Sequence, residues 1–395
     1  MATFKTISSA DIKTTRTTLN QLVDFVEEDV SGSATRKKYE VFVTSSGGGA
    51  VTSSLFHTVF DQNYTLQTAN EIFDVTFGVH SGSETAFSAS TGVDTNGKIL
   101  FRSESLMMRE KVNVYRQFAQ TLLGDASDKF RAPFSSTTSE DDINNALFLC
   151  FKRLFVRDGI KRETFAMRFF QTASASPPAT NDGNISLVSG DMTGSVIFTD
   201  VGAASSIERS QFGGDVGNIV LASDTSQTVG LMFYQKGIAV LDLERALNAN
   251  QDMTGSISCV GNSDAVTDMS ASFVPHFVAS ASMDQILEHI STTRFGSGSN
   301  TFLTFQNNTK INSTLVFCRA TADEFNYSSN PSYTDAEGRI VVIDESEQGT
   351  QKSFSFVSTI GLYDANEELL ATAKLSRPVE KNDEKDLTFR VRLDF

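Results

Sequence analysis

The strongest constraint on the fold is the alternation of apolar and polar residues in three stretches within 354–395. In 387–395 every second residue is apolar, and these residues are Leu387, Phe389, Val391, Leu393 and Phe395. In the other two stretches the residues that share one apolar face are Phe354, Phe356, Ile360 and Leu362, and Leu369, Ala371, Ala373 and Leu375, and polar turn segments separate the three stretches. A period of two is typical of strands with one buried face and one wet face. The pattern therefore predicts a C-terminal antiparallel β meander.

Other stretches have the spacing of helices. Apolar residues follow a helical period in 8–32, where Ser8 or Ser9 offers an N-cap and Gly32 a stop. Similar patterns in 103–124 and 138–159 predict two helices packed together. The predicted fold class is therefore α+β and β-rich, multi-domain, with helices near the N-terminal third.

A chain of 395 residues exceeds what one hydrophobic core usually supports. The segment 174–184, rich in Pro, Ser and Asn, is the strongest linker signal. We expect four parts, which are an amphipathic helical arm in 1–35, an α+β domain with the two packed helices in 36–175, a mostly β insertion or middle domain in 176–300, and an antiparallel β domain in 301–395.

Composition argues against several partners. The formal charge of -15 repels phosphate backbones, so nucleic acid is not expected as a partner. Cys150, Cys259 and Cys318 form no CxxC pair, which argues against a disulfide framework or a zinc site. No apolar run has the length of a membrane span, and the N-terminal residues lack the apolar core of a signal peptide. We expect synthesis in the cytoplasm and no membrane span.

Motifs for catalysis are missing from the sequence. There is no nucleophile elbow, phosphate-binding loop, dinucleotide fingerprint or metalloprotease motif, and none of the four histidines begins a metal-binding motif. We therefore expect neither an enzyme nor a cofactor, a metal or a small-molecule substrate.

Six basic residues cluster in an otherwise acidic chain, and they are Lys152, Arg153, Arg157, Lys161, Arg162 and Arg168. One interpretation of this cluster is a docking patch for an acidic partner or for nucleic acid. The other is the C-terminus of a helix followed by the wet face of a strand. We favour the second and keep Lys152, Arg153, Arg157 and Arg162 as interface candidates.

Strings near both ends resemble a known class of proteins. The string EFNYSSNP at 324–331, the string beginning FSFVSTIGLY at 354 and the closing LTFRVRLDF resemble the C-terminal region of virion structural proteins from large tailed bacteriophages. Residues 4–33 are similar to the start of such proteins in T-even-like phages of marine cyanobacteria. The resemblance points to a baseplate wedge protein of a contractile tail, located in the virion and assembled in the host cytoplasm.

The resemblance implies function by assembly with other phage structural proteins, or with a second copy of the chain. Its interface candidates are Phe325, Tyr327, Pro331, Leu362 and Tyr363. The closing strand adds Arg390, Arg392 and Phe395, because an edge strand can be completed by a neighbouring subunit. Alternatives are a protein associated with the capsid or tail tube and, less favoured, a receptor-binding or glycan-hydrolysing virion protein.

Overall fold

The computed structural model describes residues 4–26, 36–44, 50–83, 106–173, 192–205, 207–247, 251–252, 270–271, 278–295, 301–347 and 349–395. The chain divides into two compact units. The terminal unit comprises Met1–Leu19 and Lys310–Phe395, and the central unit comprises Asn20–Thr309. Strands β1 (Ile12–Val26) and β16 (Thr301–Ala320) contribute residues to both units. The terminal unit therefore joins residues that the sequence analysis assigned to its first and last segments.

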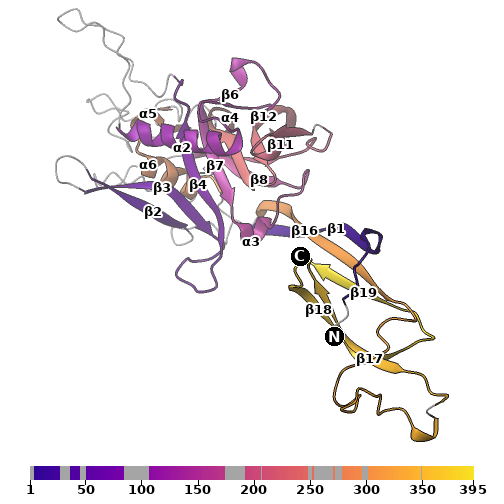
Figure 1. Ribbon diagram of the computed structural model, residues 1–395. Coiled ribbons are helices and arrows are strands. Elements are labelled where there is room, and N and C mark those ends of the chain that lie inside the picture. Colours follow the sequence, from indigo (N-terminus) through magenta and orange to yellow (C-terminus); the bar gives the residue numbers. More distant parts are fainter. Residues whose placement is uncertain are drawn as a thin grey trace, which may run out of the picture. The chain divides into compact units, whose positions relative to one another are not determined.

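The central unit is built on one large antiparallel sheet (Figure 1). From the β16 side the strand order is β8, β9, β11, β12, β13, β7, β4, β3, β2. In chain order their bounds are β2 Arg36–Thr44, β3 Ala50–Phe60, β4 Glu71–Val79, β7 Asn145–Phe151, β8 Ala166–Ala173, β9 Met192–Thr199, β11 Gly214–Leu221, β12 Asp224–Phe233 and β13 Ile238–Asp242. Short strands are β5 Phe130–Arg131, β6 Asp142–Ile143, β10 Glu208–Ser210, β14 Gln251–Asp252 and β15 Ser270–Ala271.

Two helices cover the β3 and β4 side of this sheet. Helix α2 (Leu106–Leu122) packs on β4, and α6 (Met283–Thr293) packs on β3 and β4 (Figure 1). The other described α-helices, of at most four residues, are α3 Arg153–Val156, α4 Leu243–Ala246 and α5 Val278–Ser280. Among the described residues, no helix combines the length and the apolar character that crossing a membrane requires.

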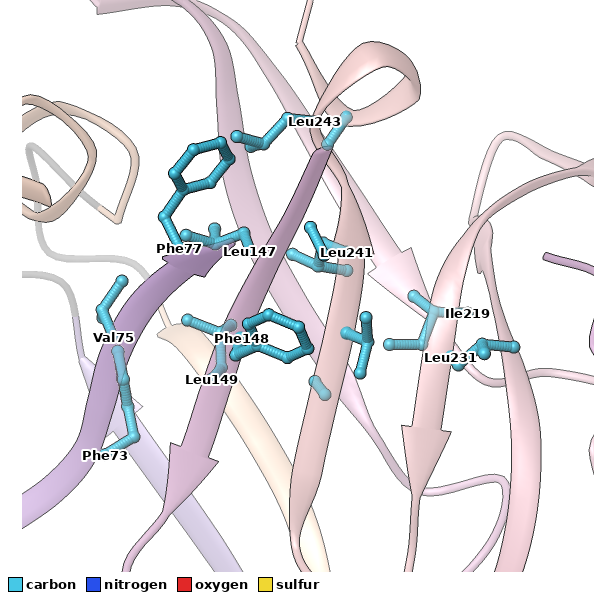
Figure 2. Close-up of a cluster of buried hydrophobic side chains, with 14 of the residues drawn as sticks. Phe73, Val75, Phe77, Leu147, Phe148, Leu149, Ile219, Leu231, Leu241 and Leu243 are labelled. Atoms are coloured by element: carbon cyan, nitrogen blue, oxygen red, sulfur yellow. The ribbon is translucent and has the colours of Figure 1, made fainter. Parts of the chain in front are cut away.

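The interior of the central unit is rich in phenylalanine. Neighbouring strands direct apolar side chains into one cluster, which Figure 2 shows for Phe73, Val75 and Phe77 of β4 and Leu147, Phe148 and Leu149 of β7, together with Ile219, Leu231, Leu241 and Leu243. Helix α2 joins this core through Phe118, whose ring stacks on Phe148 with centroids 4.0 Å apart. Tyr115 of the same helix donates its hydroxyl hydrogen bond to the Ile143 carbonyl at 2.8 Å.

The predicted α+β fold class is wrong, because the described residues are mostly β. Of the helix predicted in 8–32, residues 27–32 lie outside the described residues. Residues 9–11 form one 3-10 turn capped by Ser8, and the rest is β1, which pairs with β16. Its apolar residues do not form a buried stripe, since Ile12, Leu19 and Leu22 are 43%, 54% and 59% exposed. β1 contains a run of threonines, whose branched side chains favour extended backbone.

Of the two packed helices, the one predicted in 103–124 corresponds to α2, whereas the one predicted in 138–159 does not form. Its centre is β7, which lies between β4 and β13 in the sheet. The run in β7 is almost continuously apolar because it is buried on both faces. A short apolar run of this kind has the same appearance in a buried strand and in a buried helix.

The terminal unit contains strands where the alternation lies, but they do not form the predicted meander. Strands β17 (Phe354–Tyr363) and β18 (Leu369–Asn382) form a two-stranded antiparallel hairpin (Figure 1). Strand β19 (Leu387–Asp394) pairs with β16 instead of β18, from Ser313 opposite Asp394 to Ala320 opposite Leu387. Alternation sets the face that a residue occupies but leaves the partner strand open.

Candidate assembly surface

Apolar side chains gather on the surface of the terminal unit. Its described core cluster consists of the buried residues Val316, Leu362 and Val391, and six more apolar residues are partly buried against them. The large apolar side chains that remain exposed are Phe4, Ile12, Leu19, Phe325, Tyr327, Val341, Val342, Phe356, Tyr363, Leu369, Leu370 and Phe395. Grouped exposure of this kind marks an interaction surface, whereas single exposed apolar residues are ordinary.

A bulge in the hairpin explains part of this exposure. Val357 pairs with Val379 and Thr359 pairs with Lys374, so residues 375–378 of β18 lie opposite the single Ser358. The extra residues interrupt the alternation of faces. On one side of the bulge Leu362 is buried, whereas on the other side Ser355 is buried and Phe356 is 59% exposed. The alternation in the sequence had placed Phe356 and Leu362 on the same buried face.

The first aromatic group lies at the start of β17. Ring contacts connect Tyr327 to Tyr333, Tyr333 to Phe354 and Phe354 to Phe356, with centroids 5.8–6.2 Å apart. The hydroxyl of Tyr333 donates a hydrogen bond to the Phe354 carbonyl. Tyr327, an interface candidate, therefore belongs to a packed aromatic group of which it is the half-exposed end.

A buried lysine attaches the segment before β17 to the hairpin. The Lys381 side chain is inaccessible to solvent. Its Nζ donates to the Ala322 carbonyl at 3.1 Å, the Asn326 Oδ1 at 2.7 Å and the Asn382 carbonyl at 2.7 Å. The hydroxyl of Ser355 donates to the Phe325 carbonyl. These bonds fix the backbone around Phe325, whose side chain is 40% exposed.

The second aromatic group lies at the opposite end of the hairpin. Tyr363 is paired with Leu369, and its ring meets the ring of Phe4 edge to face with centroids 5.0 Å apart. Leu370 follows in β18 and is 68% exposed. The interface candidate Tyr363 is thus part of an exposed apolar group, whereas the candidate Leu362 is buried in the cluster with Val316 and Val391. Phe4, Leu369 and Leu370 were not predicted as interface residues. Leu369 was placed on an apolar face with its alternating neighbours, and no pattern in the sequence distinguished Phe4 or Leu370.

Residues 4–11 are bound within the terminal unit by ion pairs as well as by apolar packing. Lys5 and Glu324 form an ion pair at 2.5 Å, and Arg319 contacts Asp11 at 3.3 Å. The Lys5 ammonium, together with the Thr321 backbone N–H, lowers the pKa of Glu324 to about 2. Segments at both ends of the chain therefore build one surface.

The basic stretch of the central unit divides into bonded and exposed members. Lys152 forms ion pairs with Asp74 at 2.6 Å and Glu71 at 3.1 Å. Arg162 forms an ion pair with Asp215 at 2.9 Å and lies over the ring of Tyr234. Arg153 contacts Asp158 at 3.7 Å, but its side chain is 87% exposed, and Arg157 is exposed with a φ of 62°. Lys152 and Arg162, two of the four basic candidates, are therefore held by ion pairs within the central unit.

The candidate Pro331 is exposed and lies in the terminal unit, in the loop before β17.

One side-chain constellation in the central unit has the composition of a catalytic triad. Nδ1 of His57 lies 3.2 Å from the Ser291 hydroxyl, and Nε2 lies 3.5 Å from Asp284 Oδ1. The His57 side chain is fully buried, and Ser291 is only 9% exposed. A nucleophile must reach its substrate, and burial keeps these groups from one. The contacts fasten α6 to β3.

Comparison with known proteins gives no match. No family model, no curated protein and no solved structure is similar to this chain.

In the ranges that the structure describes, no group of three or more His, Cys, Asp or Glu side chains is placed to hold a metal ion. A pocket of about 390 Å³ in the central unit is lined by Arg245 and Asp141 among others. The Arg245 guanidinium donates hydrogen bonds there to Asp141 Oδ1 at 2.9 Å and to the Ala132 carbonyl at 2.6 Å.

Proposed function

We propose that this chain is a structural subunit of a tailed-phage virion, a component of the baseplate wedge of a contractile tail that works by protein–protein assembly. The observation that supports assembly most directly is the terminal unit itself. Its buried core is small, and its two aromatic groups and β1 leave large apolar side chains in solvent. A subunit that completes its burial against neighbours has this character.

The location in the baseplate rests on the resemblance of 4–33, 324–331, 354–379 and 387–395 to virion proteins of T-even-like phages. Part of that resemblance falls on residues that form the surface of the terminal unit. These include Phe4, Tyr327, Phe356 and Tyr363. The strings shared with virion proteins therefore coincide with exposed apolar residues, which supports a role at subunit contacts.

Gold-labelled antibodies against the chain, applied to intact phage particles under the electron microscope, test the location. Label confined to the tail end remote from the head is the expected result. Label over the head or along the tail would contradict the baseplate assignment and favour a capsid-associated or tube-associated subunit. The copy number per particle provides a second test, because a wedge protein is present in few copies whereas a decoration protein is abundant.

A further inference from the structure

Strand β19 has one bonded edge and one open edge. Asn312 and Phe395 exchange two backbone hydrogen bonds, each 2.9 Å long. In an antiparallel pair such bonded positions alternate with positions whose N–H and C=O groups point away from the partner. With the register of β16 and β19, the outward residues are Thr388, Arg390, Arg392 and Asp394. Within the described part of the chain, β19 pairs with no strand other than β16.

The open edge also has a defined side-chain pattern. Thr388, Arg390, Arg392 and Asp394 are exposed, whereas Val391 is buried with Leu393 partly buried beside it. Arg392 Nε donates a hydrogen bond to Asp394 Oδ1 at 2.8 Å. The hydrogen bonds from Ser313 and Arg392 hold the pKa of Asp394 below its usual range. Among the described residues Arg390 has no ion pair. A strand added at this edge would meet arginines on one face and the apolar core on the other.

These arginines disfavour a second copy of the chain at the edge. In each antiparallel register that pairs three or more of the four outward residues with their copies, an arginine lies opposite an arginine. The pairs are Arg390 with Arg392, Arg390 with itself, or Arg392 with itself, depending on the register. Like charges directly opposite each other across two strands are destabilising. Charge on an edge is a common protection against self-pairing.

We propose that the open edge of β19 receives an extended segment of a different protein, in which carboxylate side chains face Arg390 and Arg392 and apolar side chains alternate with them. The segment adds a strand through the outward backbone groups, and its carboxylates face Arg390 and Arg392 at the same time, which no antiparallel register of a second copy achieves. Its apolar residues extend the cluster around Val391. This inference deepens the proposed assembly function by naming the chemistry of one partner.

The test uses the full chain and two fluorescein-labelled peptides, one alternating Val and Glu and the other alternating Val and Lys. Fluorescence anisotropy measures the dissociation constant of each. We expect the acidic peptide to bind about tenfold more tightly, because two favourable cross-strand pairs replace two repulsive ones. Equal binding of the two peptides, or no binding of the acidic peptide, would overturn the proposal.

A charge-reversal variant tests whether Arg390 and Arg392 cause the preference for the acidic peptide. The double variant Arg390→Glu/Arg392→Glu should reverse the preference toward the basic peptide. Its matched control is Lys374→Glu/Arg377→Glu, which makes the same change of net charge at exposed positions of β18. The control should leave the preference unchanged. An equal effect of both double variants would show that net charge and not the β19 edge attracts the peptide, and would contradict the proposal.

A proline substitution tests whether the peptide binds at the open edge of β19. The N–H of Thr388 points outward, so Thr388→Pro removes a donor needed by an added strand and leaves the bonds to β16 intact. We expect loss of acidic-peptide binding in Thr388→Pro and its retention in Thr388→Val. Slow hydrogen exchange at Val391 and Leu393 would confirm that the β16 pairing persists. Unchanged binding in Thr388→Pro would refute the edge as the site.

Sedimentation of the chain alone provides the remaining test. A concentration-dependent dimer that Thr388→Pro abolishes would show that a second copy occupies the edge, and would overturn the choice of partner. A chain that remains monomeric supports it. These results do not depend on the location in the virion, so failure of the baseplate assignment and failure of the edge proposal are separable.

Discussion

The buried side chain of Lys381 links two segments of the terminal unit by hydrogen bonds. Lys381 places its ammonium against three oxygens of the segment before β17 and the end of β18. An ammonium held by several acceptors can be buried, whereas the same acceptors without their donor are left unsatisfied. The single lysine therefore stabilises a loop that has few buried apolar residues.

The variant Lys381→Met is expected to loosen the attachment of the loop around Phe325. Loss of hydrogen bonds to a charged group should lower the stability of the hairpin region by about 1–3 kcal/mol. Hydrogen exchange of amides in β17 and β18 measures the effect. The exposed Lys374 on the same strand provides the control variant Lys374→Met. Equal exchange rates in both variants would contradict this role.

Burial raises the pKa of Asp242 in the central unit to about 7. Because the folded state holds this proton more tightly than the unfolded state, the contribution of Asp242 to stability should be greatest below about pH 4 and should be lost between about pH 4 and pH 7. The variant Asp242→Asn keeps an oxygen that accepts from the Glu244 backbone N–H and removes the titration. We expect the denaturant midpoint of the variant to exceed that of the wild type at pH 8, and the difference to shrink toward pH 5. A pH-independent difference would contradict the assignment.

At the scale of elements, the contact between α2 and β4 depends on a close approach of backbones. A Cβ on Gly78 would lie 2.8 Å from the backbone nitrogen of Tyr115. The variant Gly78→Ala must therefore displace α2, and overpacking of this kind costs about 1–3 kcal/mol. Urea denaturation followed by circular dichroism should show the loss. The control is Gly349→Ala, because nothing lies within 4 Å of the added carbon there.

The N-terminal segment is a second element whose contribution can be measured. Ile7 packs against the core of the terminal unit, and Lys5 and Asp11 form ion pairs with residues of the same unit. Removal of residues 4–11 should therefore speed hydrogen exchange in β16 between Ser313 and Ala320 and leave α2 unchanged. Equal acceleration in α2 would indicate global destabilisation and contradict the assignment of this segment to the terminal unit.

At the scale of the whole molecule, the two units differ in how much apolar surface they bury. The central unit has a large, contiguous core, whereas the described core cluster of the terminal unit is Val316, Leu362 and Val391 with a few partly buried neighbours. Stability from burial increases with the area removed from water. We expect hydrogen exchange in increasing urea to show two transitions, with β17–β19 opening before β4 and β7. Coincident transitions would contradict this expectation.

Several elements could be read from local sequence. Residues 106–122 form a helix within the predicted range, and strands lie at 354–363 and 387–394, where apolar residues recur with a period of two. These patterns are local, because period and turn residues act on neighbouring positions. Of the predicted interface residues, Tyr327, Tyr363 and Arg390 are exposed while Leu362 is buried, and their role in an interface stays a prediction.

The sequence by itself therefore determined which stretches alternate, where α2 forms and how the charges on β19 are spaced. Only the tertiary structure decided that β19 pairs with β16, that the 138–159 run becomes a central strand and that the bulge beside Pro378 exposes Phe356. The reason is physical. Period and charge are properties of adjacent residues, whereas the choice of partner strand and the burial of a face depend on segments that are distant in the chain and meet only in the folded protein.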